Sequence, residues 1–226
     1  MTGPALVAVA HGSRNPAVED STRALARQVT RLAPHLDVRV AFLAHGAMAL
    51  ADELDAAGAD PVLVPLLLST GYHVTADLAA AAQAAGARLA PPLGPDELLA
   101  RALAARLAQA GVPARTPVVL AAAGSSDPQA AKDVAQQAGL LSAGLGAPVE
   151  PAFATGAPPS VPDAVRELAT ATGRPVAVAS YLMAPGEFHD QLHRAGAAWV
   201  TAPLGDHPAV AGLIVDRYRV AVRGAA

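Results

Sequence analysis

Short, unbroken aliphatic runs alternate along the whole chain with longer segments whose apolar residues recur at helical spacing. A strand that is apolar at every position is buried on both faces, which is typical of parallel sheets covered by crossover helices. The alternation therefore predicts an α/β fold. Strands are expected at 5–10, 38–43, 61–68, 88–90, 117–122, 149–154, 175–182 and 199–202, and helices at 16–32, 47–57, 75–85, 96–110, 128–142, 160–170, 187–195 and 208–222.

The composition excludes several classes of protein. Of the 226 residues, 53% are hydrophobic and 15% charged, which is incompatible with a disordered chain. The formal charge of −3 and the lack of a Lys/Arg run argue against a nucleic-acid partner. Cysteine is absent, so disulfides, thiolate nucleophiles, Fe–S clusters and cysteine zinc sites are excluded.

No apolar run reaches the roughly 18 residues that span a bilayer, and residues 1–10 lack a basic leader region. The expectation is a cytoplasmic protein with no membrane partner, present as a monomer or a homodimer.

An internal repeat divides the sequence. Residues 7–16 are echoed by 119–128, residues 41–42 by 152–153, and residues 92–94 by 203–205, always about 111 residues apart. Three matches in the same order predict two tandem α/β halves, 1–112 and 113–226, facing each other across a central cleft.

Three histidines follow expected strands of the first half. His11 comes directly after the first strand, His45 after the second, and His73 lies in the loop after the third. Ligands of open parallel sheets bind beyond the carboxyl ends of the strands, so His11 and His73 are expected to point into one crevice. In the second half Ala123 replaces His11, and Glu187 follows the strand equivalent to the third.

Imidazoles at strand ends have two chemical uses. Neutral imidazole binds Fe²⁺, Co²⁺, Ni²⁺ or Zn²⁺, and a pair leaves coordination positions open, so that the ion can be handed on. Neutral imidazole also accepts a proton near pH 7. The 62-residue spacing of the pair is no compact motif, and single loop histidines also serve as surface or capping groups.

The loop after the first strand has two interpretations. Gly12 lets the backbone approach a ligand, and Ser13 and Arg14 add donors near a helix N-terminus, as in an anion cradle. Alternatively, the loop is ordinary punctuation, with Asn15 as N-cap and Pro16 in the first helical turn. Nucleotide-binding glycine motifs and the G-x-S-x-G elbow are absent.

The other candidates are weighed by context. Tyr72 could stack on a flat ligand or pack in the core, and Trp199 is expected in the core. His35 is expected in a solvated turn and His207 at a helix start. Four residues separate His189 from His193, which could share a helix face but are expected to be mainly surface residues.

Two segments carry a family resemblance. Residues 11–16 and 64–74, with Asp77 and Leu78 after them, resemble the sirohydrochlorin/cobalt chelatase family of class II tetrapyrrole chelatases. The resemblance covers the chain and is sharpest over 5–110. It implies two parallel α/β domains and insertion of Co²⁺, Fe²⁺ or Ni²⁺ into sirohydrochlorin or a related tetrapyrrole, for siroheme- or cobalamin-type biosynthesis.

The resemblance also implies roles for residues. His11 and His73 match the paired histidines that bind the metal and assist deprotonation, and Ala123 agrees with a degenerate second half. One departure concerns Ala44, where the family often has an acidic residue. His45 or Glu187 could take that role, or the role is missing.

The sequence thus predicts a lyase that uses no organic cofactor and takes the metal ion as a substrate. Gly12, Ser13, Arg14, Tyr72, His45 and Glu187 are the expected contacts to the tetrapyrrole. Two alternatives stay open: a non-catalytic carrier of metal or tetrapyrrole, and an unrelated α/β enzyme that holds a carboxylate or phosphate in the 11–14 loop.

Overall fold

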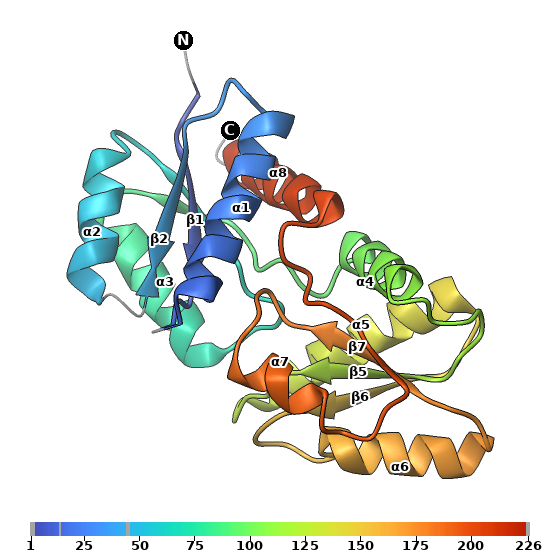
Figure 1. The fold of residues 1–226 in the computed structure, drawn as a ribbon. Coiled ribbons are helices and arrows are strands. Elements are labelled where there is room, and N and C mark those ends of the chain that lie inside the picture. Colours follow the sequence, from blue (N-terminus) through green and yellow to red (C-terminus); the bar gives the residue numbers. More distant parts are fainter. Residues whose placement is uncertain (1–2, 14, 44–45, 225–226) are drawn as a thin grey trace. The chain divides into compact units, whose positions relative to one another are not determined.

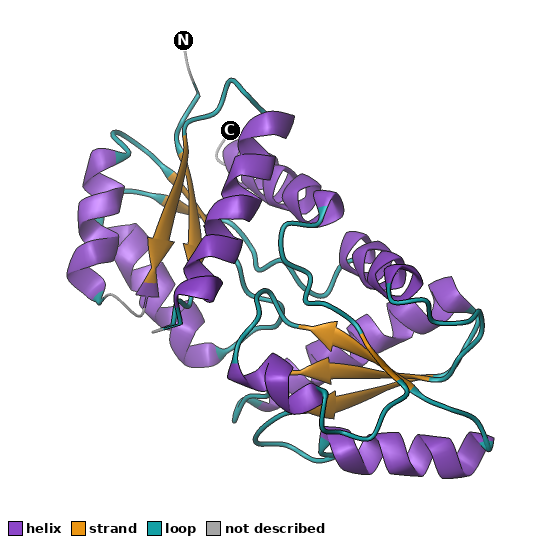
Figure 2. Ribbon diagram, in the orientation of Figure 1, coloured by secondary structure: helices purple, strands orange, loops and turns teal. Residues whose placement is uncertain are grey.

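The computed structural model describes residues 3–13, 15–43 and 46–224, with the side chains at 47 and 72–75 outside the description. Two parallel sheets are present, and helices flank the strands of each (Figures 1 and 2). The predicted α/β class is therefore confirmed.

The first sheet has the order β2-β1-β3-β4, and the second has the matching order β6-β5-β7-β8. The strands are β1 (Leu6–Ala10), β2 (Val38–Phe42), β3 (Val62–Pro65), β4 (Arg88–Leu89), β5 (Val118–Ala122), β6 (Val149–Phe153), β7 (Ala177–Tyr181) and β8 (Trp199–Val200). The helices are α1 (Pro16–Leu32), α2 (Ala47–Ala56), α3 (Tyr72–Ala84), α4 (Glu97–Gln109), α5 (Pro128–Leu145), α6 (Val161–Thr172), α7 (Glu187–Leu192) and α8 (Pro208–Arg223).

Each sheet is centred on a fully buried strand. β1 lies between β2 and β3, with Leu6 opposite both Val38 and Val62, and all five of its residues are buried. β5 takes the same place between β6 and β7. A central strand covered on both faces needs an apolar side chain at every position, which explains the unbroken aliphatic runs.

The compact units differ from the sequence halves at their ends. One unit comprises residues 1–93 and 206–226, and the other comprises residues 94–205. Helix α4 therefore packs on α5 and β7 of the second unit, although it belongs to the first repeat, and α8 packs on α1 and β3 of the first unit. The boundaries 1–112 and 113–226 describe the sequence repeat. In the packing, α4 of the first repeat lies in the second unit, and α8 of the second repeat lies in the first unit.

Two equivalent arginines hold the exchanged helices. In the first unit Arg217 of α8 donates from Nε to the carbonyl of Pro92 (2.8 Å) and from Nη2 to that of Leu93 (2.9 Å). In the second unit Arg106 of α4 donates from Nη2 to the carbonyl of Leu204 (2.9 Å). Both the arginines and the leucines lie 111 residues apart, so the repeat has kept one docking contact in both units.

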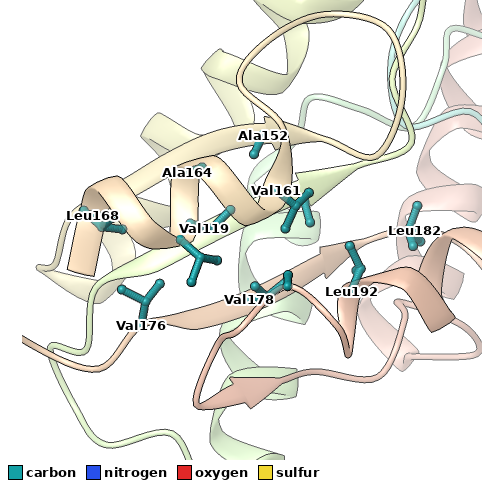
Figure 3. Close-up of a cluster of buried hydrophobic side chains, with 12 residues drawn as sticks. Val119, Ala152, Val161, Ala164, Leu168, Val176, Val178, Leu182 and Leu192 are labelled. Atoms are coloured by element: carbon teal, nitrogen blue, oxygen red, sulfur yellow. The ribbon is translucent and has the colours of Figure 1, made fainter. Parts of the chain in front are cut away.

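The core of the second unit shows how a helix covers its sheet. Val161, Ala164 and Leu168 of α6 pack toward Val119 and Val178 of the strands (Figure 3). These side chains are all less than a tenth exposed. The spacing of three and four residues on α6 therefore matches the face predicted from the sequence.

A buried polar network lies beside this core. Gln137 of α5 is fully buried, and its Oε1 accepts the Asp96 N–H at the start of α4 (2.9 Å). Its Nε2 donates to the Asp96 carbonyl (3.2 Å), and the Tyr181 hydroxyl donates to its Oε1 (3.4 Å). Gln137 thus joins α5 to the start of α4 through both backbone groups of Asp96, whose carbonyl also accepts the Ala100 N–H (3.2 Å).

Several element ends differ from the sequence predictions. Helix α3 begins at Tyr72, three residues before the predicted start. The sequence does not mark this start, because the N-cap residue Gly71 has no side-chain oxygen that could cap the helix. Helix α7 ends at Leu192 rather than near residue 195. Trp199 lies in a strand as predicted, but its side chain is only half-buried. None of the helices within the described ranges is both long and apolar enough to cross a bilayer.

Candidate functional site

The carboxyl edge of the first sheet brings two predicted segments together. β1 and β3 are neighbours, with Val9 opposite Pro65, and the Leu66 N–H donates to the Val9 carbonyl (2.8 Å), which continues the ladder. The chain leaves the sheet at the next position of each strand. His11, which directly follows β1, is exposed at this edge.

The loop after β1 is held by short-range hydrogen bonds. Gly12 has φ of 80°, which favours glycine because other residues rarely adopt it. The Ser13 hydroxyl oxygen accepts the Asn15 N–H (3.1 Å), and Asn15 Oδ1 accepts the Ala17 N–H (3.0 Å). With Pro16 at the first turn of α1, the capping interpretation is confirmed. The anion-cradle interpretation stays a prediction, since Arg14 lies outside the described residues.

The segment after β3 ends in the first turn of α3. Gly71 is the N-cap, with an extended backbone and no side-chain cap, so His73 is the second residue of the helix rather than a loop residue. This corrects the predicted position of His73 and places it beside the helix N-terminus, where backbone N–H groups lack intrahelical partners. The side chains of Tyr72 and His73 lie outside the description, so the convergence of the two imidazoles stays a prediction.

The equivalent edge of the second sheet has the same loop without the histidine. Gly124 has φ of 101°, and a Cβ there would come 1.9 Å from the Thr155 carbonyl oxygen. Thr155 donates from its N–H (3.0 Å) and its hydroxyl (2.9 Å) to the carbonyl of Ala123. The Ser125 hydroxyl accepts the Asp127 N–H (3.1 Å), just as Ser13 accepts that of Asn15. The loop geometry is therefore conserved between the repeats, and the side chain that could carry chemistry is not.

Glu187 is the first residue of α7, the helix that follows β7 in the second unit, and its side chain is exposed. It is a carboxylate at the carboxyl edge of the second sheet, as expected. The role of Glu187 as a contact to the tetrapyrrole or as a proton acceptor stays a prediction. Ala44 and His45, the other positions relevant to proton transfer, lie outside the described residues.

The remaining histidines divide as follows. His35 is exposed in a turn, as predicted. His207 is the N-cap of α8, where its Nδ1 accepts the Ala209 N–H (3.2 Å), which confirms the predicted helix-start role. His189 is half-buried, and its Nε2 lies 3.0 Å from the Thr201 carbonyl oxygen. The sequence predicts His189 mainly as a surface residue. It carries no signal for this contact, because Thr201 lies 12 residues further along the chain, directly after β8.

Among the residues that the structure describes, no group of three or more His, Cys, Asp or Glu side chains gathers as a metal site would. His45 and the His73 side chain lie outside that part of the chain. The donors that the described structure places directly after β1 include the His11 imidazole and the Ser13 hydroxyl.

Two copies of one parallel α/β unit, with a histidine directly after the central strand in one copy and an alanine in the other, define a duplicated α/β protein with unequal edges. A family model described as CbiX matches the chain twice, over residues 5–110 and again over 117–221, so the chain belongs to the CbiX family. The predicted resemblance to the sirohydrochlorin/cobalt chelatases is thereby confirmed.

Relatives and solved structures agree with this assignment. The sirohydrochlorin ferrochelatase of Bacillus subtilis (strain 168) is 29% identical over 176 residues, which cover 70% of this chain and 67% of the relative. The structure of SirB from Bacillus subtilis with Fe³⁺ matches with a TM-score of 0.83 and 25% identity, covering 97% of this chain and 96% of SirB.

Two further structures share the fold. The sirohydrochlorin chelatase SirB from Bacillus subtilis subspecies spizizenii, in complex with cobalt, has a TM-score of 0.78 at 22% identity and covers 97% of this chain and 95% of its own. The multi-domain protein DR2241 from Deinococcus radiodurans has a TM-score of 0.70 at 20% identity, over 95% of this chain and 54% of its own.

Proposed function

We propose that this protein is a chelatase that inserts Co²⁺, Fe²⁺ or Ni²⁺ into sirohydrochlorin or a related tetrapyrrole. The observation that carries the proposal is that His11 directly follows β1, and His73 begins the helix after the neighbouring strand β3, in a chain of the CbiX family. A relative named sirohydrochlorin ferrochelatase and a similar structure named SirB with Fe³⁺ support the choice of reaction and of metal class.

The reaction replaces two pyrrole N–H protons of the macrocycle with one divalent ion, so two protons must leave for each ion that enters. An imidazole binds a metal only in its neutral form, through the lone pair of one ring nitrogen. His11 and His73 hold the ion at few coordination positions, which keeps the remaining positions open to the ring nitrogens. Once the ion has moved, the same lone pairs can accept the departing protons.

The surrounding backbone suits a ring that carries carboxylates. The N–H groups at the start of α3 form the positive end of the helix dipole, which attracts anions. The Ser13 oxygen accepts the Asn15 N–H, and its O–H can rotate to donate to a substrate carboxylate. Gly12, Arg14 and Tyr72 complete the proposed substrate contacts of this edge. The net charge of −3 does not attract a polyanion, so these local donors must do so.

A second proton acceptor must come from another residue than position 44, because Ala44 stands where the family resemblance implies an acid. His45, the next residue, and Glu187, exposed at the edge of the second sheet, are the proposed candidates. The reaction needs no organic cofactor, and the protein acts on small molecules in the cytoplasm as a monomer or a homodimer.

The decisive experiment is anaerobic incubation with sirohydrochlorin and Co²⁺, Fe²⁺ or Ni²⁺ in turn, following the absorption spectrum of the macrocycle. Insertion above the rate without protein is expected for at least one metal. His11→Ala and His73→Ala should each reduce the rate by about 100-fold or more, whereas the exposed turn variant His35→Ala should not. Unchanged rates in both site variants would place the reaction elsewhere.

The alternative is a carrier that binds metal or tetrapyrrole without turnover, and Ala44 in place of an acid is the feature that favours it. In that case the spectral change stops at one macrocycle per chain. Continued conversion with excess substrate rejects the carrier.

A further inference from the structure

A second pair of imidazoles lies in the second unit, on the helix that begins with Glu187. His189 is in α7, and His193 is the C-cap of that helix with helical backbone angles, φ −65° and ψ −14°. Residues four apart in a helix lie on one face. The two ring centroids are 5.0 Å apart and the rings are nearly perpendicular, at 83°.

A fixed support holds this pair. Leu192, between the two histidines, is 2% exposed and points into the core beside Val178 and Leu182 (Figure 3). The residue anchors a short helix to β7 while the imidazoles stay accessible, His189 half-buried and His193 exposed.

The contact of His189 determines which ring nitrogen can bind a ligand. Its Nε2 lies 3.0 Å from the Thr201 carbonyl oxygen, which can only accept, so Nε2 carries the proton and the lone pair is on Nδ1. The carbonyl is itself fixed, because Thr201 is fully buried and also accepts the Ser180 hydroxyl (2.7 Å). A ring N–H donated to a backbone carbonyl is the arrangement that orients histidine ligands in metal sites.

Charges around the pair have mixed sign. Glu187 and Asp190 are exposed on the same helix and favour a cation, whereas Arg194 follows His193 and opposes it. The imidazoles, rather than the net charge, must therefore provide the affinity.

We propose that His189 and His193 form a two-imidazole site for a divalent cation that prefers nitrogen ligands, such as Co²⁺ or Ni²⁺. Nδ1 of His189 and one nitrogen of His193 bind the ion, and water fills the other positions. A rotation of the exposed His193 side chain brings its lone pair toward that of His189. With two protein ligands the site is open and exchanges its ion readily, unlike a structural site with four. The inference does not depend on the proposed chelatase activity.

The test uses Co²⁺ alone, titrated into the triple variant His11→Ala/His45→Ala/His73→Ala and followed by calorimetry and by the visible absorption of the metal. One ion per chain is expected. Adding His193→Gln should weaken binding by about 100-fold, since a chelating pair becomes a single imidazole. His189→Gln should do the same, and its amide can still donate to the Thr201 carbonyl.

His35→Gln in the same background is the matched control and should leave the affinity unchanged. The proposal is overturned if the triple variant binds no Co²⁺, if either glutamine variant weakens binding by less than about tenfold, or if the control weakens it equally. Insertion rates of His193→Gln report separately on the proposed function, so the two proposals can fail independently.

Discussion

The two units share one sheet order and one loop design, but they distribute polar groups differently. In the described part of the first unit, Thr22 is the buried polar side chain, and the loop with His11 is exposed. The second unit buries Thr116, Asp133, Gln137, Ser180 and Thr201. Its corresponding loop is bound to Thr155 through the Ala123 carbonyl.

The difference shows how a duplicated fold can divide its tasks. The first copy has kept an accessible imidazole on a loop held by local hydrogen bonds. In the second copy, hydrogen bonds to buried polar groups hold the strand ends and α4. A buried polar group that loses its hydrogen-bond partner destabilises the folded state. Loss of a buried hydrogen bond in the second unit should therefore reduce stability, whereas loss of the exposed imidazole in the first unit should reduce activity.

The largest expected effect separates the two equivalent loops. His11→Ala should reduce metal insertion by about 100-fold or more, because we propose that its imidazole binds the metal. The melting temperature should not change, because the side chain is exposed. Ala123→Ser, at the matching position, should leave the rate within about twofold. Steady-state rates with sirohydrochlorin and circular dichroism melting would check both. A similar loss of activity in the two variants would contradict the division of tasks.

Gln137 is the next position that distinguishes the units. Gln137→Leu removes two buried side-chain hydrogen bonds, to the N–H and to the carbonyl of Asp96, so the free energy of unfolding should fall by about 2 kcal/mol. The adjacent exposed variant Gln136→Leu should change it by less than about 0.5 kcal/mol. Urea denaturation measures both values, and equal stabilities would show that the network contributes little.

Tyr181 predicts an alkaline limit for the second unit. Burial, followed by the charges of Asp133 and Asp96, raises the pKa of Tyr181 far above its ordinary value. Since the folded state holds the proton more tightly than the unfolded state, this contribution is present below about pH 10 and is lost as the pH rises further.

The free energy of unfolding should therefore fall by about 1.4 kcal/mol per pH unit above pH 10. Urea denaturation at several alkaline pH values would show this slope, and Tyr181→Phe should flatten it. Burial also raises the pKa of Tyr218, in the first unit, but against the lowering charge of Arg88, so Tyr218→Phe should change the slope less. Equal slopes in the two variants would remove this distinction between the units.

The smallest expected effect tests where the units are alike. Arg106→Met and Arg217→Met should each reduce the free energy of unfolding by about 1 kcal/mol, because each removes hydrogen bonds to the turn before an exchanged helix. Arg101→Met, on the exposed face of α4, should cost less than about 0.5 kcal/mol. Urea denaturation of the three variants would reveal unequal docking if one arginine variant behaved like the control.

The sequence predicts much of this architecture because a parallel sheet leaves a strong local pattern. Unbroken runs such as 117–122 identify the central strands, and Asn15 and Pro16 mark the start of α1. The exchange of α4 and α8 leaves no such pattern, since each helix has an apolar face that fits either sheet. The sequence sign of this exchange is the equivalent pair Arg106 and Arg217, but their hydrogen-bond partners become known only from the structure.

The candidate site is predicted in part for the same reason. β1 and β3 are neighbours as predicted, and His11 directly follows β1. The helical position of His73 was missed because Gly71 gives no capping signal. The hydrogen bond between His189 Nε2 and the Thr201 carbonyl is a tertiary contact, which the local sequence does not encode.

The reciprocal exchange of α4 and α8 has a thermodynamic consequence. Each repeat supplies a helix that covers part of the other's sheet, so a cut between the repeats at residue 112 would separate both sheets from one of their helices. Residues 113–226 expressed alone should therefore unfold at a lower urea concentration than residues 94–205, which keep α4 packed on α5 and β7.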